Sequence, residues 1–149
     1  MGHTYTRLIY HIIYSTKNRE LWLVDEIKNR IFAYKAGIIK NHKGKAIIIN
    51  GTAEHLHILC ELQSSISIAD LVLTVKANSS SWFHKTFKRA AFAWQEGYAA
   101  LTVSPSKIEI VKKYIQNQEE NHRKITFKEE YLSFLKEEGI KYDKRYVFD

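Results

Sequence analysis

Two kinds of apolar pattern alternate along the chain. Short runs rich in β-branched and aromatic residues are typical of strands, and longer segments with apolar residues three and four positions apart are typical of helices. We therefore expect strands at residues 7–14, 46–49, 55–62 and 98–103. We expect helices at residues 25–41, from residue 67 onward, from residue 105 through residue 118, and at residues 126–138.

Local signals support the ends of these elements. Ser67, with Asp70 three positions later, resembles a capping box that opens the second helix, and Pro105 suits the first turn of the third. Gly139 is expected to end the fourth helix. Asn50–Gly51 indicates a turn between the second and third strands.

The order of the elements predicts the fold class. Strand, helix, strand, strand, helix, strand is the order of a ferredoxin-like split βαβ arrangement with an antiparallel sheet. Two further helices follow at the C-terminal end, so we expect an α+β fold in which these helices carry part of the site. No repeat or linker interrupts the pattern, and residues 1–149 are expected to form a single domain.

Composition narrows the choice of partners. The chain has 149 residues, 45% of them hydrophobic, and a formal net charge of +7, which favours a polyanionic partner, most simply nucleic acid. The alternative is a basic protein without such a partner. No segment is long and apolar enough to span a membrane. With Cys60 as the only cysteine, we expect a reducing, cytoplasmic location.

His55 and His57 are the first candidates for chemistry. Because side chains alternate along a strand, both imidazoles face one side of the 55–62 strand while Leu56 and Ile58 face a core. Two imidazoles on one face can share a divalent metal ion. On its own such a pair is more often a surface or structural feature, so the interpretation depends on a second motif.

Tyr114 and Gln118 supply that motif. They are four residues apart on the third expected helix and share one face. The alternative is that Tyr114 is a core aromatic beside the apolar stripe of Ile108, Val111 and Ile115, and that Gln118 is solvated. Together with the histidine pair, they instead predict a nucleophile beside a third metal ligand.

Three other polar residues are weighed beside these motifs. Glu54 points to the opposite face from the histidines, and we interpret it as a supporting or solvated group. We interpret His11 as a structural residue or a DNA contact. His122 lies one turn beyond Gln118 and could approach the site, but we favour a solvated helix end.

His55-Leu56-His57, followed far downstream by Tyr114-Ile115 and Gln118, resembles the motif pair of the small single-tyrosine HUH transposases of bacterial insertion sequences. The likeness covers nearly the whole chain. The other segments that carry it are Tyr10-His11, residues 15–19, residues 94–98, residues 104–106, and residues 139–143 with Tyr146. Some members carry two histidines after the glutamine segment, whereas this chain has Asn121-His122.

The resemblance implies a reaction, a metal ion and partners. Tyr114 would attack a phosphodiester in single-stranded DNA, so that the 5′ phosphate becomes linked to tyrosine and a 3′ hydroxyl leaves. His55, His57 and Gln118 would hold a cation, with Mg²⁺ as the physiological ion and Mn²⁺ also competent. Hairpins at the element's ends would be the DNA partners, bound by a homodimer whose active sites are shared between protomers. Because the phosphotyrosine keeps the energy of the bond, no nucleotide cofactor is expected.

Candidate DNA contacts are basic residues near aromatic ones, because cations neutralise phosphates and rings stack unpaired bases. They are Lys17, Arg19, Lys76, Lys85, Lys88 and Arg89. The equally weighted alternative for the last three is a solvated helix end with Trp82 in the core.

Two rival functions remain open at this point. The first is a related HUH enzyme that nicks or processes repeated hairpins outside a mobile element, with the same site. The second is a non-catalytic nucleic-acid binding module, which would need aromatic residues on an open sheet face and no metal site.

Overall fold

A four-stranded antiparallel sheet forms the centre of the protein in the computed structural model, which describes residues 2–149 and, at Asp25, the backbone alone. The strand order is β2-β3-β1-β4. The strands are β1 (Leu8–Ser15), β2 (Lys45–Gly51), β3 (His55–Leu62) and β4 (Ala99–Thr102). The predicted ferredoxin-like arrangement is confirmed, because this order and these antiparallel pairings are those of a split βαβ sheet.

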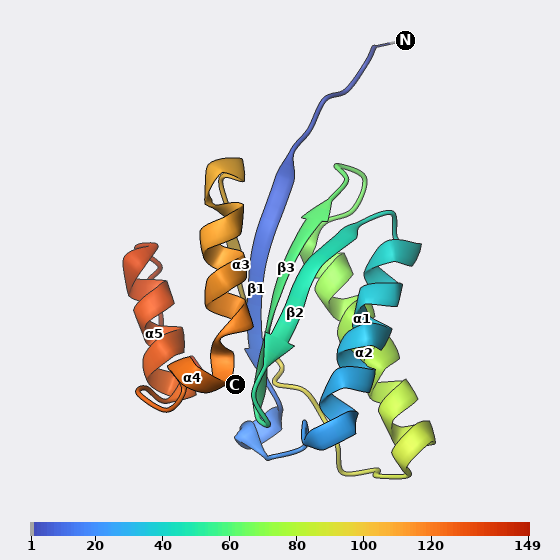
Figure 1. Cartoon of the computed structure of the whole chain (residues 1–149), viewed down its shortest axis with the longest axis vertical. Coiled ribbons are helices and arrows are strands. Elements are labelled where there is room, and N and C mark those ends of the chain that lie inside the picture. The colour runs from blue at the N-terminus through green and yellow to red at the C-terminus, as the bar shows by residue number, and fades with distance from the viewer. Residues whose placement is uncertain (1) are drawn as a thin grey trace.

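Helices cover both faces of this sheet (Figure 1). They are α1 (Asp25–Asn41), α2 (Ile68–Phe87), α3 (Ile108–Gln116), α4 (Gln118–Asn121) and α5 (Phe127–Glu137), with 3₁₀ turns η1 (Lys17–Arg19) and η2 (Pro105–Lys107). The helices α1 and α2 lie on one face, and α3, α4 and α5 lie on the other. Within residues 2–149, no helix is both long and apolar enough to cross a membrane.

Alternation along β3 divides its side chains between the two layers. Leu56 and Ile58 join the large apolar cluster under α1 and α2. His55 and His57 have the opposite orientation, and Leu59 packs with Ile115 of α3. The strand therefore carries a core on one face and the candidate site on the other.

The third expected helix is interrupted before Gln118. It ends at Gln116, and Asn117 leaves helical geometry with φ −98° and ψ 29°. Asparagine side chains hydrogen-bond to its last carbonyls: Asn50 Nδ2 donates to Ile115 O at 2.9 Å, and Asn121 Nδ2 donates to Tyr114 O at 3.0 Å. Tyr114 and Gln118 thus belong to α3 and α4, not to one continuous helix.

The predicted turn at Asn50–Gly51 is wrong, because both residues lie in β2 and pair with His57 and Leu56 of β3. The chain turns at residues 52–54 instead. Gly51 is required there by close approach of the backbones, since a Cβ at this position would collide with the carbonyl oxygen of His55. By contrast, the capping signal at Ser67 is confirmed, because its Oγ accepts from the Asp70 amide. The structure also shows a complete capping box, Thr126 with Glu129, before α5.

Candidate active site

The two histidines of β3 are fully buried, with exposed fractions of 0% for both. His55 Nδ1 lies 2.9 Å from Thr52 Oγ1, and His57 Nδ1 lies 2.7 Å from Nε2 of the buried His11. These contacts turn both Nε2 atoms toward the same space above the sheet. Burial, and secondarily the neighbouring His57, lowers the pKa of His55 to about 3, so this imidazole is neutral as a metal ligand must be.

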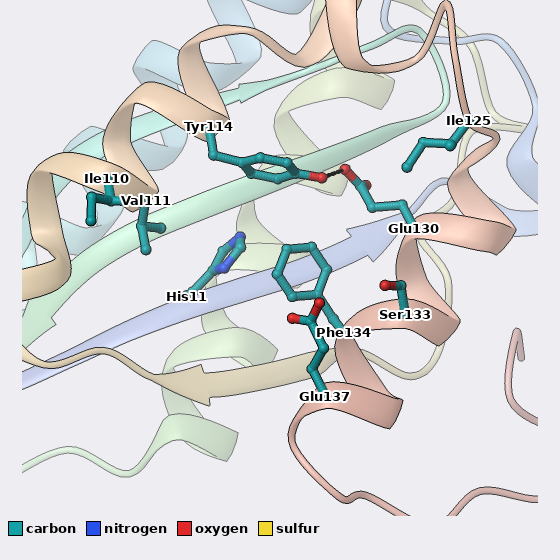
Figure 2. Close-up of a pocket in the computed structure, with 9 residues that line it drawn as sticks. All are labelled: His11, Ile110, Val111, Tyr114, Ile125, Glu130, Ser133, Phe134 and Glu137. Carbon is teal, nitrogen blue, oxygen red and sulfur yellow. Dashed lines mark hydrogen bonds between the residues drawn. The ribbon is translucent and has the colours of Figure 1, made fainter.

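Tyr114 reaches this space from α3. Its hydroxyl donates a hydrogen bond to Glu130 Oε2 (Figure 2). Burial first, and then the hydrogen bond and charge of Glu130, raise the pKa of Tyr114 above its usual value. The phenol is therefore held in its protonated form, with its hydroxyl oriented by the carboxylate that accepts its hydrogen bond.

Gln118 reaches the same space from α4, and it is also fully buried. Its Oε1 lies 2.9 Å from His55 Nε2, and its Nε2 lies 3.4 Å from Glu130 Oε2. The structure thus brings together all four residues that the sequence motifs single out, although the intervening turn at Asn117 differs from the expected continuous helix.

Glu130 on α5 is a central site residue that sequence reasoning missed. Its side chain is 1% exposed, and Oε1 lies 2.9 Å from His57 Nε2 and 3.6 Å from His55 Nε2. Burial acts to raise the pKa of Glu130, but the close His122 and His57 imidazoles and the Tyr114 hydroxyl outweigh it and hold this pKa well below its usual value. The carboxylate is therefore ionised.

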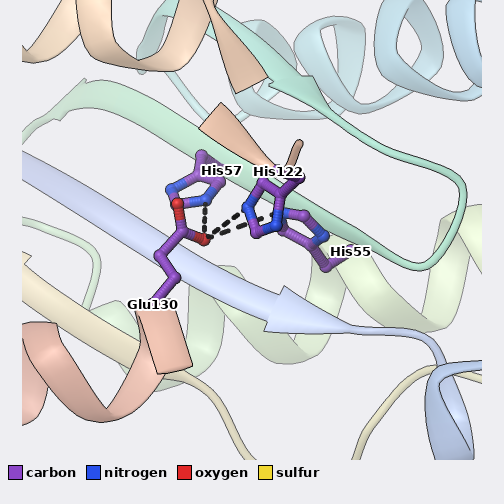
Figure 3. Close-up of side chains that lie close together, drawn as sticks. All are labelled: His55, His57, His122 and Glu130. Atoms are coloured by element: carbon purple, nitrogen blue, oxygen red, sulfur yellow. Dashed lines mark hydrogen bonds and ion pairs between the residues drawn. The ribbon is translucent and has the colours of Figure 1, made fainter. Parts of the chain in front are cut away.

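The interpretation of His122 as part of a solvated helix end is wrong. Its ring packs on His55 with centroids 4.4 Å apart, and its Nε2 lies 3.1 Å from Glu130 Oε1. The break at Asn117 is the physical reason, because it redirects α4 so that its C-terminal end folds back over the histidine pair. Figure 3 shows the three imidazoles around the carboxylate, and one ligand atom from each of these four residues lies within 4.8 Å of the others.

A cleft of about 400 Å³ opens between α3 and α5 beside the Tyr114 hydroxyl (Figure 2). Its lining is mostly apolar, with carboxylates at one side. The lining residues are His11, Ile110, Val111, Tyr114, Ile125, Glu130, Ser133, Phe134 and Glu137. This cleft is a route to the tyrosine that does not pass through the buried histidines.

The candidate DNA contacts fall into two groups. Lys76 has a structural role, because its Nζ donates to three carbonyl oxygens within the fold. These are the carbonyls of Gln95, Glu96 and Gly97, at 2.7, 3.1 and 2.7 Å. Three acceptors need three N–H groups, which only the ammonium form has, although burial lowers the pKa of Lys76 to about 8.

The other basic candidates lie closer to solvent. Lys17 is exposed, and the guanidinium of Arg19 lies 5.5 Å from the centre of the Phe148 ring. Lys85, Lys88 and Arg89 are exposed at and after the end of α2, on the layer opposite to the site. Trp82 nearby is half-buried, and its ring stacks on that of Tyr34 of α1 with centroids 4.9 Å apart.

Comparison with known proteins agrees with this geometry. The sequence model of the family described as "Transposase IS200 like" matches residues 4–118. The ISDra2 transposase TnpA of Deinococcus radiodurans is 25% identical over 123 residues, which cover 78% of this chain and 87% of that protein.

Two solved structures have similar folds. A crystal structure of a Deinococcus radiodurans R1 protein described as a transposase has a TM-score of 0.64 and 26% identity, over 79% of this chain and 96% of that one. A REP-associated tyrosine transposase bound to a REP hairpin has a TM-score of 0.56 and 11% identity, over 83% of this chain and 72% of that one. The second likeness concerns the fold alone.

Proposed function

We propose that this chain, which belongs to the IS200-like transposase family, cleaves and rejoins single-stranded DNA with Tyr114 as the nucleophile. The most direct support is that Tyr114, the histidine pair and Gln118 lie together in one buried site, although β3 and α3 are far apart in the sequence. A hydroxyl beside candidate metal ligands is the arrangement that phosphoryl transfer to a side chain needs.

In this mechanism, the phosphodiester enters through the cleft between α3 and α5. The Tyr114 oxygen forms a bond to phosphorus while Glu130 Oε2, which already accepts its hydrogen bond, takes the phenolic proton. The bond from phosphorus to the 3′ oxygen breaks, and that oxygen leaves as a hydroxyl with a proton from Glu130 or water. Rejoining is the reverse, with a 3′ hydroxyl attacking the phosphotyrosine.

The residues present fit a divalent cation, because two imidazoles and an amide oxygen converge in a site that holds an ionised carboxylate. His55, His57 and Gln118 would hold the ion, with Mg²⁺ as the physiological choice and Mn²⁺ also competent. When bound, the ion would polarise the scissile phosphate and offset its developing charge.

Single-stranded DNA hairpins are the proposed substrate, supported by the hairpin bound to the fold relative. The net charge of +7 suits this partner. A non-catalytic module is disfavoured, because it would need an open sheet face and helices cover both faces here. A related HUH enzyme outside a mobile element would use the same site and differs only in its DNA.

Covalent trapping tests the proposal. Labelled single strands from the DNA that flanks the gene, folded as hairpins, are incubated with the protein and Mg²⁺ and run on a denaturing gel. We expect a protein–DNA adduct with the wild type and with the control Tyr10→Phe, and none with Tyr114→Phe, which should keep its gel shift. An adduct with Tyr114→Phe would assign the nucleophile to another residue, and no adduct from the wild type with any strand would refute strand cleavage.

The homodimer is a further part of the proposal, because two DNA ends need two nucleophiles and a two-fold axis supplies them. In the single chain, Tyr114 meets the histidines of its own chain, so sharing between protomers stays a prediction. Mixing Tyr114→Phe and His57→Ala protomers tests it. Shared sites regain cleavage, with DNA attached only to the His57→Ala chain, whereas sites completed within one chain stay inactive despite proven subunit exchange.

A further inference from the structure

We propose that His55, His57, His122 and Glu130 form a four-ligand site that binds a transition-metal ion such as Zn²⁺ much more tightly than Mg²⁺. This site differs from the set of His55, His57 and Gln118 in two ligands and in the class of metal it takes. It does not depend on strand cleavage, so it can fail or succeed independently of the proposed function. His122 and Glu130 also lie outside residues 4–118, the part matched by the family.

The separations between Glu130 and the three imidazoles are close to those of a tetrahedral site, and no two of the four ligand atoms are more than 4.8 Å apart. Glu130 Oε1 lies 2.9, 3.1 and 3.6 Å from the Nε2 atoms of His57, His122 and His55. Around Zn²⁺, with metal–ligand distances of about 2.0–2.1 Å, the ligand atoms of a regular tetrahedron are about 3.3–3.4 Å apart. The observed separations lie on both sides of that value, so small side-chain rotations would be enough to admit the ion.

His122 gives independent evidence that a ligand belongs here. Its side chain is 10% exposed, and its Nε2 is the only buried side-chain nitrogen or oxygen within residues 2–149 that has no hydrogen-bond partner. The atom lies close to Glu130 Oε1 but off the direction of a hydrogen bond. A buried polar atom without a partner costs about 1–3 kcal/mol, and a metal ion bound to its lone pair would remove that cost.

The surroundings fix the orientation of the other two imidazoles. His55 Nδ1 contacts Thr52 Oγ1, and His57 Nδ1 contacts His11 Nε2, so each ring is held by the nitrogen that does not face the site. A partner on the far nitrogen of this kind is typical of metal-bound histidines. Thr52 and His11 therefore act as positioning residues for the site.

The donor set decides which metal is bound. Three imidazole nitrogens and one carboxylate oxygen in four-coordinate geometry suit Zn²⁺ and Co²⁺, whereas Mg²⁺ requires six oxygen ligands and keeps several waters. His55, His57 and Glu130 are at most 1% exposed, which favours an ion that gives up its waters over one that keeps them. Because Glu130 is on α5 and the histidine pair is on β3, the ion would also fasten α5 to the sheet.

The experiment uses the full chain, stripped of metal and titrated with Zn²⁺, Co²⁺ or Mg²⁺ in the absence of DNA. Calorimetry should show one Zn²⁺ per chain and much weaker binding of Mg²⁺. Co²⁺ should give the intense visible absorption of a four-coordinate ion, and Zn²⁺ should raise Tm because it binds the folded state. X-ray absorption on the Zn²⁺-loaded wild type should count three imidazoles and one oxygen without any substitution.

Variants then separate the two ligand sets. His122→Gln and Glu130→Gln should each weaken Zn²⁺ at least about 10-fold, since even indirect contacts of metal ligands change affinity by that amount. Gln118→Leu, which removes only a contact of His55 and Glu130, should weaken it less than either, and His42→Gln should leave it unchanged. Circular dichroism checks that each variant folds. The proposal is overturned if Gln118→Leu weakens Zn²⁺ while His122→Gln does not, if Mg²⁺ binds equally well, or if fewer than three imidazoles are counted.

Discussion

The two faces of the sheet differ in what they bury: one face buries apolar side chains, and the other buries a group of polar ones. Under α1 and α2, one continuous apolar cluster joins both helices to the sheet. Under α3–α5, two small clusters lie on either side of a buried group of three histidines, a glutamine and a glutamate. Stability is thus concentrated on the first face, which leaves the second free to bury polar groups at a cost that a metal ion or substrate can offset.

Lys35 is the exception that clarifies this contrast. Its amine is completely buried on the apolar face, 2.6 Å from the Tyr14 hydroxyl, 3.2 Å from Ser79 Oγ and 3.8 Å from the centre of the Trp94 ring. Unlike the site on the other face, this group includes no carboxylate. Burial, with the nearby Lys76 as a second cause, lowers the pKa of Lys35 well below its usual value. On this face, burial therefore disfavours the charged form of a polar group, and no opposite charge compensates it.

The largest expected effect comes from Phe83, in the middle of the apolar face. Its ring is completely buried and stacks on Phe92 with centroids 3.8 Å apart. We expect Phe83→Ala to lower the free energy of unfolding by about 3–5 kcal/mol, because it removes a large buried ring and leaves a cavity. Urea unfolding measures this. A loss below about 1 kcal/mol would mean that the apolar face is not where stability resides.

Leu135 on α5 provides the matched test on the other face. It is 6% exposed and belongs to the small cluster with Phe127 and Tyr131. We expect Leu135→Ala to cost about 2–3 kcal/mol, at the lower end for such changes, because fewer neighbours surround it. Hydrogen exchange should show α5 amides opening more readily than those of α1, and equal protection of the two helices would contradict the contrast between the faces.

Lys35 should give stability a dependence on pH. Above the lowered folded-state pKa, the folded chain lacks a proton that the unfolded lysine still binds, so stability rises with pH. The expected slope is about 1.4 kcal/mol per pH unit, up to the unfolded pKa near ~10.4. Urea unfolding of the wild type and Lys35→Met from about pH 8 to about pH 10 isolates this term from that of Lys76. Parallel pH profiles would show that the folded state keeps Lys35 charged.

The contrast between the faces also explains how much the sequence could predict. Alternation on β3 assigns Leu56 and Ile58 to a core and His55 and His57 to the opposite face, as the structure shows. Strands and long helices follow from repeated apolar positions, each of which adds to the same signal. The prediction of a turn at Asn50–Gly51 was wrong because Gly51 is required by the close approach of two strand backbones, and the local sequence does not indicate such an approach.

The roles of Glu130 and His122 in the site were not predicted, because they too depend on contacts between segments that are far apart in the sequence. The role of His122 depends on the break in the helix at Asn117. Side chains of β2 and α4 stabilise this break, and no local sequence pattern predicts it. Glu130 did leave one signal: it is flanked on α5 by Phe127 and Phe134, three residues before it and four after it, so it is an acid on an apolar stripe. Such a position is a candidate for a buried, functional carboxylate.

The smallest expected effects concern the basic residues near the surface. Substituting them tests whether bound DNA contacts only the side of the molecule that carries the site or the opposite side as well. Arg19 lies over Phe148, which packs on Tyr131 of α5, so Lys17 and Arg19 are on the side of the site. Lys85 and Lys88 lie at the end of α2 in the opposite layer. We expect charge on the site's own side to contribute more to binding single-stranded DNA.

Removing one cation that neutralises a phosphate should reduce the slope of log affinity against log salt by about 0.7 for a single strand. We therefore expect Lys17→Gln with Arg19→Gln to lower the slope by up to about 1.4, and Lys85→Gln with Lys88→Gln, a pair of equal charge change, to lower it less. Fluorescence anisotropy across a salt series measures both slopes. If the α2 pair has the larger effect, the strand passes over the stability face as well, and the division between the two faces does not extend to DNA binding.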